Sequence, residues 1–234
     1  MKKTALAILI LLVGCTAGKS GDVKFSTLAH DEYALGITGR INEVYTAPVS
    51  FETFWKEFAT GNRTKIFNAG LEQLRTKYDG EFIKKLVEVY RNHKPKITLP
   101  QDSRDVLRRL SGKWTLALLT DGFLPAQQLK VRALGIERYF KCIIYTEQLG
   151  RQFWKPSPVG FEKLMEILDT RPENIAYVAD NPVKDFIAPN KLGFSTIQII
   201  RPARIHTESC AQAGAAARYV IHRLTQLPAI IEQL

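Results

Sequence analysis

The sequence predicts an α/β fold, in which helices cover both faces of a parallel β-sheet, together with a small helical module near the amino-terminal end. From residue 115 onward, short and continuously apolar runs alternate with amphipathic stretches, as in strand–helix–strand units. Residues 30–96 differ, because their apolar residues recur at intervals of three and four and indicate helices alone. The chain has 234 residues, 45% of them hydrophobic, which is enough for one core and a small accessory domain.

The first predicted region, residues 1–29, contains an apolar segment and a loop. The helical module follows over residues 30–96, with apolar spacing typical of helices at 51–61, 65–78 and 80–93. The predicted α/β core then fills residues 97–234. An insertion directly after a first strand would place the module beside the carboxyl ends of the strands.

The α/β region contains five runs that predict buried strands, because they are continuously apolar rather than alternating: residues 114–120, 141–146, 175–180, 194–200 and 218–221. Amphipathic stretches between them predict three helices: residues 126–136, 158–168 and 183–193. Two of these helices close on a glycine, which ends helices well because it tolerates a left-handed backbone.

The amino-terminal apolar run, Ala5 to Val13, admits three interpretations. It resembles a bacterial lipoprotein signal, because Lys2 and Lys3 precede it and "LVGC" would be cleaved and lipidated at Cys15. That interpretation predicts a lipoprotein of the bacterial cell envelope. The following "GCTAGKS" resembles a Walker A phosphate loop but is one residue short of that motif.

The third interpretation keeps the run as a strand of a cytoplasmic protein. If the strand order of the family named below holds, Ala5 to Val13 would lie between the strands that end at Thr120 and Asp180. Removing it would leave both neighbours with unpaired backbone groups, which argues for retention. A shifted gene start would also produce a segment with features of both a signal and a core strand. The sequence alone leaves these alternatives open.

The composition and charge of the chain limit the substrates, metals and membrane contacts that we expect. The net charge of +10 is spread thinly, without a dense basic stripe, so we expect anionic small substrates and no nucleic acid. Cys15, Cys142 and Cys210 lack the spacing of a zinc site or a disulfide framework. No apolar run reaches the roughly 18 residues needed to cross a bilayer, so contact with a membrane is expected only through a lipid on Cys15.

Polar residues stand at the ends of two predicted strands, which is where ligands bind in open α/β sheets. A lysine, Lys155, begins the helix that lies between those strands in the sequence. Hydroxyl and amide groups with a lysine can neutralise a phosphate, and carboxylates suit Mg²⁺. The residues after the first strand are Thr120, Asp121 and Gly122, and those after the second are Asp180, Asn181 and Asp185.

These stretches resemble the motifs of the haloacid dehalogenase-like hydrolases, over residues 110–234 and, with the helical module as a cap, over 30–234. "LALLTDG" resembles the second motif, "FWKPSP" the third and "YVADNPVKD" the fourth. The resemblance implies a Rossmann-like core with a small helical cap. It also implies that Thr120, Asp121, Gly122 and Lys155 bind phosphate, with Thr120 and Lys155 catalytic, and that Asp180 and Asp185 hold Mg²⁺.

The first motif of the family, Asp-x-Asp, is absent from the chain. The nearest match is "DVKFS", in which Asp22 would be the nucleophile and a metal ligand. Lys24 then stands where the family has the acid–base aspartate, and Ser26 matches the hydroxyl of the motif. The sequence therefore predicts a magnesium-dependent phosphatase of a small phosphorylated metabolite, with weak activity. The alternative is a degenerate member that binds a phosphorylated ligand or a partner without turnover.

Overall fold

The structure is a computed structural model that describes residues 9–10, 51–61, 64–95, 97–201 and 212–234. The chain divides into two compact units, one formed by residues 1–21 with 98–234 and the other by residues 22–97. Asp22, Lys24, Ser26 and Cys15 lie outside the described residues. The roles predicted for these four residues stay predictions. Within the described residues, no helix is long and apolar enough to span a membrane.

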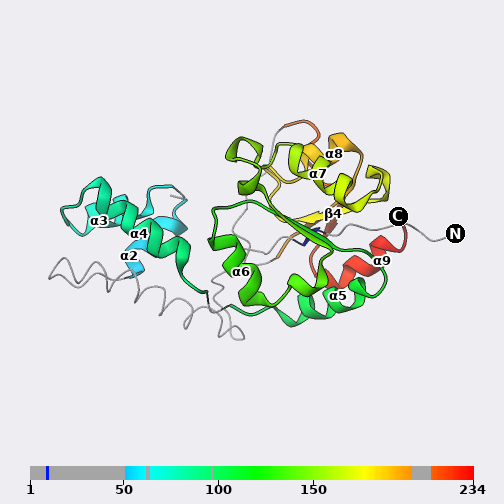
Figure 1. Cartoon of the computed structure of the whole chain (residues 1–234), viewed down its shortest axis with the longest axis horizontal. Coiled ribbons are helices and arrows are strands. Elements are labelled where there is room, and N and C mark those ends of the chain that lie inside the picture. Colours follow the sequence, from blue (N-terminus) through cyan, green and yellow to red (C-terminus); the bar gives the residue numbers. More distant parts are fainter. Residues whose placement is uncertain (1–8, 11–50, 62–63, 96, 202–211) are drawn as a thin grey trace. The chain divides into compact units, whose positions relative to one another are not determined.

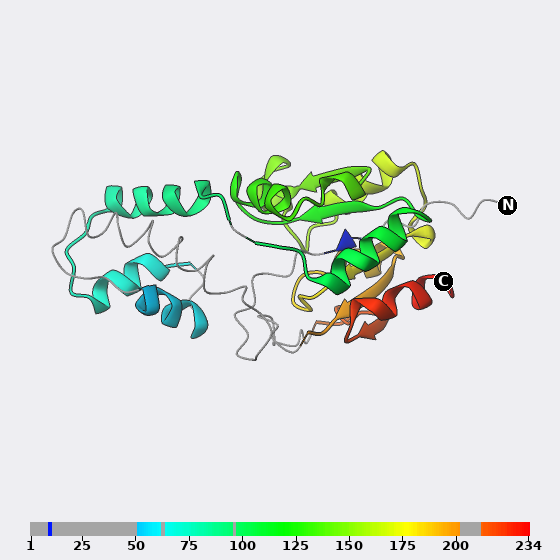
Figure 2. The same ribbon diagram turned by 90° about the horizontal axis from the view of Figure 1, so that it is seen from below.

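The unit of residues 22–97 contains three described helices, α2 (Phe51–Ala59), α3 (Ile66–Gln73) and α4 (Gly80–Asn92) (Figure 2). Their small core is built on Phe54, Leu71 and Leu86. Gly70 allows α3 to approach α2, because a Cβ atom at this position would lie 2.4 Å from the ring of Phe54. The module thus has a hydrophobic centre of its own.

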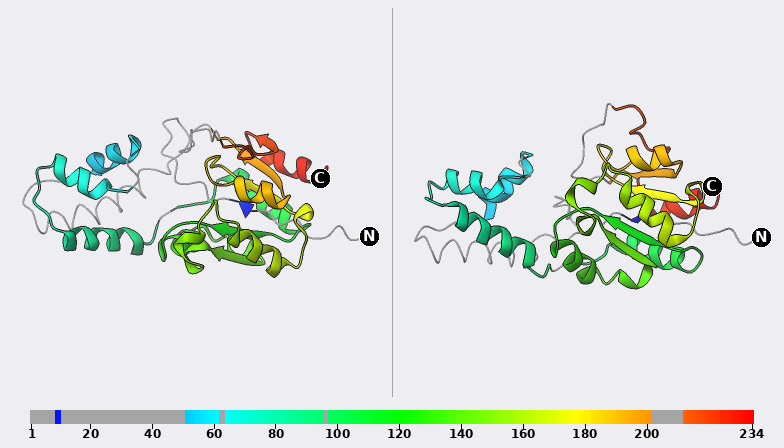
Figure 3. Two further views of the ribbon diagram at one scale, coloured as in Figure 1. Left: turned by 90° about the horizontal axis from the view of Figure 1, so that it is seen from above. Right: turned by 45° about the horizontal axis from the view of Figure 1, so that its top comes forward.

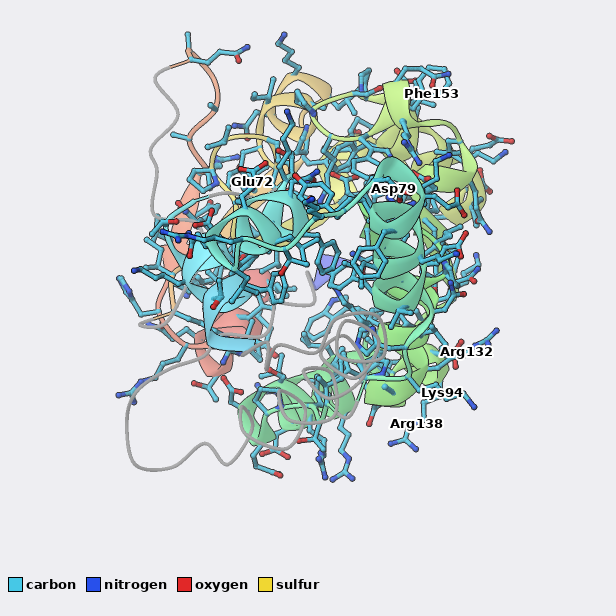
Figure 4. All side chains as sticks on the ribbon, turned by 90° about the vertical axis from the view of Figure 1, so that its left-hand side faces the viewer. Glu72, Asp79, Lys94, Arg132, Arg138 and Phe153 are labelled. Atoms are coloured by element: carbon cyan, nitrogen blue, oxygen red, sulfur yellow. The ribbon has the colours of Figure 1, made fainter. Side chains whose placement is uncertain are left out.

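Polar side chains define the turn that joins α3 to α4. Asp79 caps α4, because its carboxylate accepts a hydrogen bond of 2.8 Å from the backbone N–H of Phe82. The hydroxyl of Tyr78 donates to Glu72 at 2.8 Å. Glu72 and Asp79 are labelled in Figure 4. The Asp79 contact satisfies a backbone N–H that the start of α4 would otherwise leave unpaired, and the Tyr78 contact joins the turn to α3.

The other unit is an α/β core with parallel strands, as the sequence predicts. One sheet has the order β1-β4-β5-β6, and β2 pairs with β3 in a second, two-stranded sheet. Cα atoms of β1 lie within 8 Å of β2, so the two sheets are neighbours at that point. The strands are β1 (Leu9–Ile10), β2 (Ala117–Thr120), β3 (Cys142–Tyr145), β4 (Ala176–Ala179), β5 (Ser195–Ile199) and β6 (Tyr219–Ile221).

Strand β1 contains two residues of the amino-terminal apolar run. Its register sets Leu9 opposite Tyr177 and Ile10 opposite Val178 of β4. The run therefore supplies a strand between β4 and β2, which is the position that the strand interpretation predicts. Whether the segment is also processed as a signal stays a prediction.

Helices cover both sides of the strands. Helices α7 and α8 lie on one side, and α5, α6 and α9 lie on the other (Figures 1 and 3). Short 3-10 helices of three residues each connect several of these elements. The bounds of the helices are α5 (Gln101–Ser111), α6 (Ala126–Leu134), α7 (Val159–Leu168), α8 (Ile187–Leu192) and α9 (Leu227–Ile231).

The core between these layers fixes the strands on which the polar residues stand. Leu118 and Leu119 of β2 are fully buried. Phe161 of α7 packs edge-on against Tyr177 of β4, with ring centres 5.0 Å apart. Gly160 brings α7 against β2, because a Cβ atom there would lie 2.9 Å from a methyl group of Leu119. The loop before α7 is thereby held close to the end of β2.

The helix expected over residues 183–193 is shorter than predicted, because α8 begins only at Ile187. The preceding residues form a turn, in which the side chain of Asn181 accepts from the N–H of Val183 at 3.0 Å. Asp185 accepts from the N–H of Asn181 at 3.0 Å. These side chains satisfy backbone groups that a longer helix would use internally.

Candidate active site

The predicted site residues that the structure describes gather at the carboxyl ends of β2 and β4. Thr120 is the last residue of β2, and Asp180 directly follows β4. Lys155 lies in the loop before α7. All three are buried, with 5%, 3% and 6% of their surface exposed, respectively. Buried polar residues at the ends of parallel strands are typical of ligand sites in this fold class.

Lys155 forms an ion pair with Asp185, whose Oδ1 lies 2.7 Å from the lysine Nζ. The two side chains are 1% and 0% exposed. Lys155 Nζ also donates to the hydroxyl of Tyr177 at 3.4 Å. Burial lowers the pKa of Lys155, but the carboxylates of Asp185 and Asp121 outweigh burial, so the pKa lies above its ordinary value. The lysine therefore stays protonated at neutral pH.

Asp185 holds this lysine in place through a second contact. Its Oδ2 accepts from the backbone N–H of Asn181, so each carboxylate oxygen has a polar partner. Asp185 thus fixes Lys155 relative to the turn after β4. Its predicted role as a ligand of Mg²⁺ stays a prediction.

Asp121 connects the loops around the site. Its Oδ1 accepts from the hydroxyl of Thr146 at 2.8 Å and lies 3.4 Å from the backbone N of Lys155. Its Oδ2 lies 2.7 Å from Nζ of Lys184, and the carboxylate side chain is 4% exposed. One carboxylate therefore links the loops after β2, β3 and β4 with the loop before α7.

The charge of Asp121 is stabilised by its neighbours. Burial raises the pKa of Asp121, but the positive charges of Lys155 and Lys184 and the hydrogen bond from Thr146 together lower it below its ordinary value. The side chain is thus ionised at neutral pH. The sequence indicated Asp121 only as a phosphate-binding position, and its link to Lys184 was not predicted.

The backbone at Gly122 explains why glycine follows Asp121. Gly122 has a φ of +135°, a conformation that side chains rarely adopt. A Cβ atom there would lie 2.2 Å from Nε2 of Gln127, which donates to the carbonyl of Asp121 at 2.9 Å. The hydroxyl of Thr120 lies 3.5 Å from the same carbonyl. This loop presents a hydroxyl and main-chain amides, which suit an anionic ligand.

The described residues supply part of a magnesium site. Asp180 offers a buried carboxylate, and Mg²⁺ is commonly held by one or two carboxylates together with waters and substrate phosphates. Within the described residues, no group of three acidic, histidine or cysteine side chains could hold a metal ion. Asp180 therefore fits Mg²⁺ chemistry, although these residues do not form an all-protein cage.

A family model of the haloacid dehalogenase-like hydrolases matches residues 11–193. The chain therefore belongs to this hydrolase family. The match begins directly after β1, and it includes Thr120, Lys155, Asp180 and Asp185. The predicted subgroup and the altered first motif remain predictions.

Two curated relatives are named glyceraldehyde 3-phosphate phosphatase. The Methanocaldococcus jannaschii protein is 25% identical over 175 residues, which cover 74% of each chain. The Methanopyrus kandleri protein is 33% identical over 86 residues, which span 37% of this chain and 36% of that protein.

A solved structure has the same fold. The HAD-hydrolase YfnB from Bacillus subtilis, described as bound to magnesium, superposes with a TM-score of 0.65 at 19% identity. The superposition covers 97% of this chain and 99% of YfnB. At this identity the likeness establishes the architecture alone.

Proposed function

We propose that the protein is a magnesium-dependent phosphatase that acts on a small phosphorylated metabolite. The observation that carries this proposal is the buried Lys155–Asp185 ion pair beside Thr120, Asp121 and Asp180. A protonated lysine with a hydroxyl and main-chain amides can neutralise a phosphate dianion, and it costs no reorganisation if it is already held in place. The names of the two relatives point to the same substrate class.

Each described residue has a distinct part in this proposal. Lys155 Nζ has three protons, of which Asp185 and Tyr177 accept two, so that one remains for a phosphate oxygen or for Asp22. Thr120 donates its hydroxyl to another phosphate oxygen. Mg²⁺, bound through Asp180, would supply further charge neutralisation of the phosphate.

Asp22 is the proposed nucleophile. Its carboxylate would attack phosphorus while the ester P–O bond breaks, and the leaving oxygen would take a proton from water, giving an aspartyl-phosphate and the free alcohol. Water would then release inorganic phosphate and regenerate Asp22. Such a covalent intermediate replaces one difficult displacement by two easier steps.

Activity is tested by the release of inorganic phosphate from p-nitrophenyl phosphate and glyceraldehyde 3-phosphate, with Mg²⁺ and after its removal by a chelator. We expect magnesium-dependent turnover that Lys155→Met and Asp180→Asn abolish. Lys163→Met is the matched control, because Lys163 is an exposed residue of α7 that forms an ion pair with Glu166. Unchanged turnover in both site variants would refute the assignment.

If no phosphatase turnover is observed, two further measurements distinguish the remaining explanations. Metal-dependent binding of phosphate without hydrolysis, measured by calorimetry, would favour the degenerate binding protein. Release of chloride from a 2-chloro acid without phosphatase activity would instead identify a dehalogenase. If the protein shows neither turnover nor metal-dependent phosphate binding, both the phosphatase and the binding protein are refuted.

Lys24 gives a prediction about the rate. An ammonium group with an ordinary pKa near 10.4 cannot accept a proton at neutral pH, so it cannot activate the water that cleaves an aspartyl-phosphate. We expect Lys24→Asp to speed turnover of p-nitrophenyl phosphate by at least about tenfold. If neither Lys24→Asp nor Asp22→Asn changes the rate, "DVKFS" is not the first motif.

The cellular location is a separate proposal, motivated by "LVGC" after Lys2 and Lys3. A processed signal would leave Cys15 as a lipidated first residue, anchoring the protein in the bacterial envelope. Mass spectrometry of the protein from its native host distinguishes the two cases. An unmodified chain that begins at Met1 or Lys2 would refute the lipoprotein and favour a cytoplasmic location.

A further inference from the structure

The α/β unit has a polar cavity that shares no residue with the candidate active site. It has a volume of about 240 Å³ and lies between the start of α5, the end of α6 and the 3-10 helix Glu137–Tyr139. The lining residues are Leu99, Arg104, Arg108, Leu134, Gly135, Arg138 and Tyr139.

Three arginines and no carboxylate line this cavity. Arg104 and Arg108 are four residues apart in α5, a spacing at which like charges face each other and destabilise a helix. Within the described part of the chain, none of the three arginines forms an ion pair with an acidic side chain. The cavity therefore concentrates positive charge that no acidic side chain of the described residues neutralises in an ion pair.

Other cations near α5 are arranged differently. Arg109 of α5 and Lys113, just beyond its end, both lie close to Glu232, at 3.5 Å and 3.1 Å. The same helix thus has one set of cations that face a carboxylate and another that faces the cavity. A variant of a cation that faces Glu232 therefore serves as a control for the loss of positive charge alone.

Tyr139 is the point on which two of the arginines converge. Arg138 Nη2 donates to the tyrosine hydroxyl at 3.2 Å, and its guanidinium lies 5.0 Å from the ring centre. The hydrogen bond from Arg138, followed by the interaction with Arg108, holds the pKa of Tyr139 below its ordinary value. Both guanidinium groups thus favour negative charge at this end of the cavity, where an anion would be stabilised. Figure 4 labels Arg138 and also Arg132 of α6.

We infer that this arginine cavity is a binding site for a small phosphate-bearing molecule, separate from the candidate active site. A guanidinium group presents several N–H donors in a plane and binds phosphate oxygens in pairs. Arg104 uses one nitrogen on the carbonyl of Leu99 at 3.4 Å, which leaves other donors. Leu99 and Leu134 offer an apolar wall for the organic part of the ligand. The inference does not rest on phosphatase activity.

Calorimetry with phenyl phosphate and tripolyphosphate tests the site. A chelator is included, because binding in the arginine cavity needs no metal and metal-dependent binding at the candidate active site is then suppressed. We expect Arg108→Gln/Arg138→Gln to weaken binding at least about tenfold, since hydrogen bonds to charged groups are strong. Arg109→Gln and Arg132→Gln remove the same charge from α5 and α6 outside the cavity, and should change affinity by less than about twofold.

Three results would overturn the inference: no binding of either probe to the wild type, an equal loss of affinity in the control variants, or binding only to vesicles that contain phosphatidylserine. If the double variant fails to fold by circular dichroism, Arg138→Lys replaces it. That variant keeps the charge but loses the planar fork, so weaker binding supports the site and unchanged binding contradicts it.

Discussion

The candidate active site and the arginine cavity both contain several charged side chains, but they balance those charges in opposite ways. At the active site, Lys155 is buried against Asp185, and Lys184 lies against Asp121. In the cavity, the arginines are nearer to solvent, and among the described lining residues there is no carboxylate. Burial explains the difference, because a charge removed from water needs a partner, whereas a solvated charge does not. The buried charges of the candidate active site therefore need partners within the protein, whereas the arginines of the cavity are left for the proposed ligand to neutralise.

The largest effect is expected at the buried pair. Lys155→Met would leave the carboxylate of Asp185 buried without its cation, and removing one partner of a buried pair typically costs about 3–5 kcal/mol of the free energy of unfolding. Urea denaturation measures this loss. Lys163→Met, which breaks an exposed pair, should cost less than about 1 kcal/mol.

A double variant sharpens this prediction. Lys155→Met/Asp185→Asn removes both charges, so we expect it to be more stable than Lys155→Met alone while activity remains absent. Equal stability of the double and single variants would show that the loss comes from packing around Lys155 rather than from an unpaired charge.

A smaller effect is expected from Asp121→Asn. The variant loses the ion pair with Lys184 but keeps the shape of the side chain, and we expect a loss of about 1–3 kcal/mol at pH 7. The pKa of Asp121 is lowered in the folded state, so the carboxylate stabilises the fold above its unfolded pKa of about 3.9. That stabilisation is lost as the pH falls through the lower folded value.

The pH dependence provides the measurement. The difference in unfolding free energy between wild type and Asp121→Asn should be constant from pH 5 to neutral and shrink below about pH 4. A difference that persists undiminished in acid would mean that the carboxylate charge is not the cause. Lys184→Gln should show the same trend with a smaller loss, because Lys184 is partly exposed.

The smallest effect is expected at the surface cluster of Arg109, Lys113 and Glu232. The carboxylate of Glu232 is exposed, so water already solvates it and salt screens its partners. Glu232→Gln should leave the thermal unfolding midpoint unchanged within error. A clear shift would show that exposed pairs contribute here as much as the buried ones do.

The five strands of the second half were predictable because buried parallel strands leave continuous apolar runs in the sequence. Helix α5 was missed, although Val106, Leu107 and Leu110 have helical spacing and are buried. Its charged residues conceal the apolar stripe, since the helix also carries Arg104, Asp105, Arg108 and Arg109 on its other positions. Numerous charged residues in a helix can thus hide the few residues that pack.

Local motifs mark Thr120, Lys155 and Asp180 in the sequence, and the structure describes all three as buried, while their roles in a site stay predictions. Lys184 and Thr146 were not predictable, since their contacts with Asp121 join segments 63 and 25 residues apart in the chain. Tyr177 was seen only as part of an apolar strand, and its hydroxyl contact with Lys155 depends on tertiary packing. Lys184 does lie within "DNPVKD", so a lysine in a metal-binding motif was the available signal.

The contact between Asp121 and Lys184 also has a consequence for how these two positions vary among relatives. Because each side chain neutralises the other at 2.7 Å, a change at one position alone leaves a charge without its partner. Relatives that lose the acid at the position of Asp121 should therefore tend to lose the cation at the position of Lys184 as well. The two positions would then vary together across the family, although neither needs to touch the substrate.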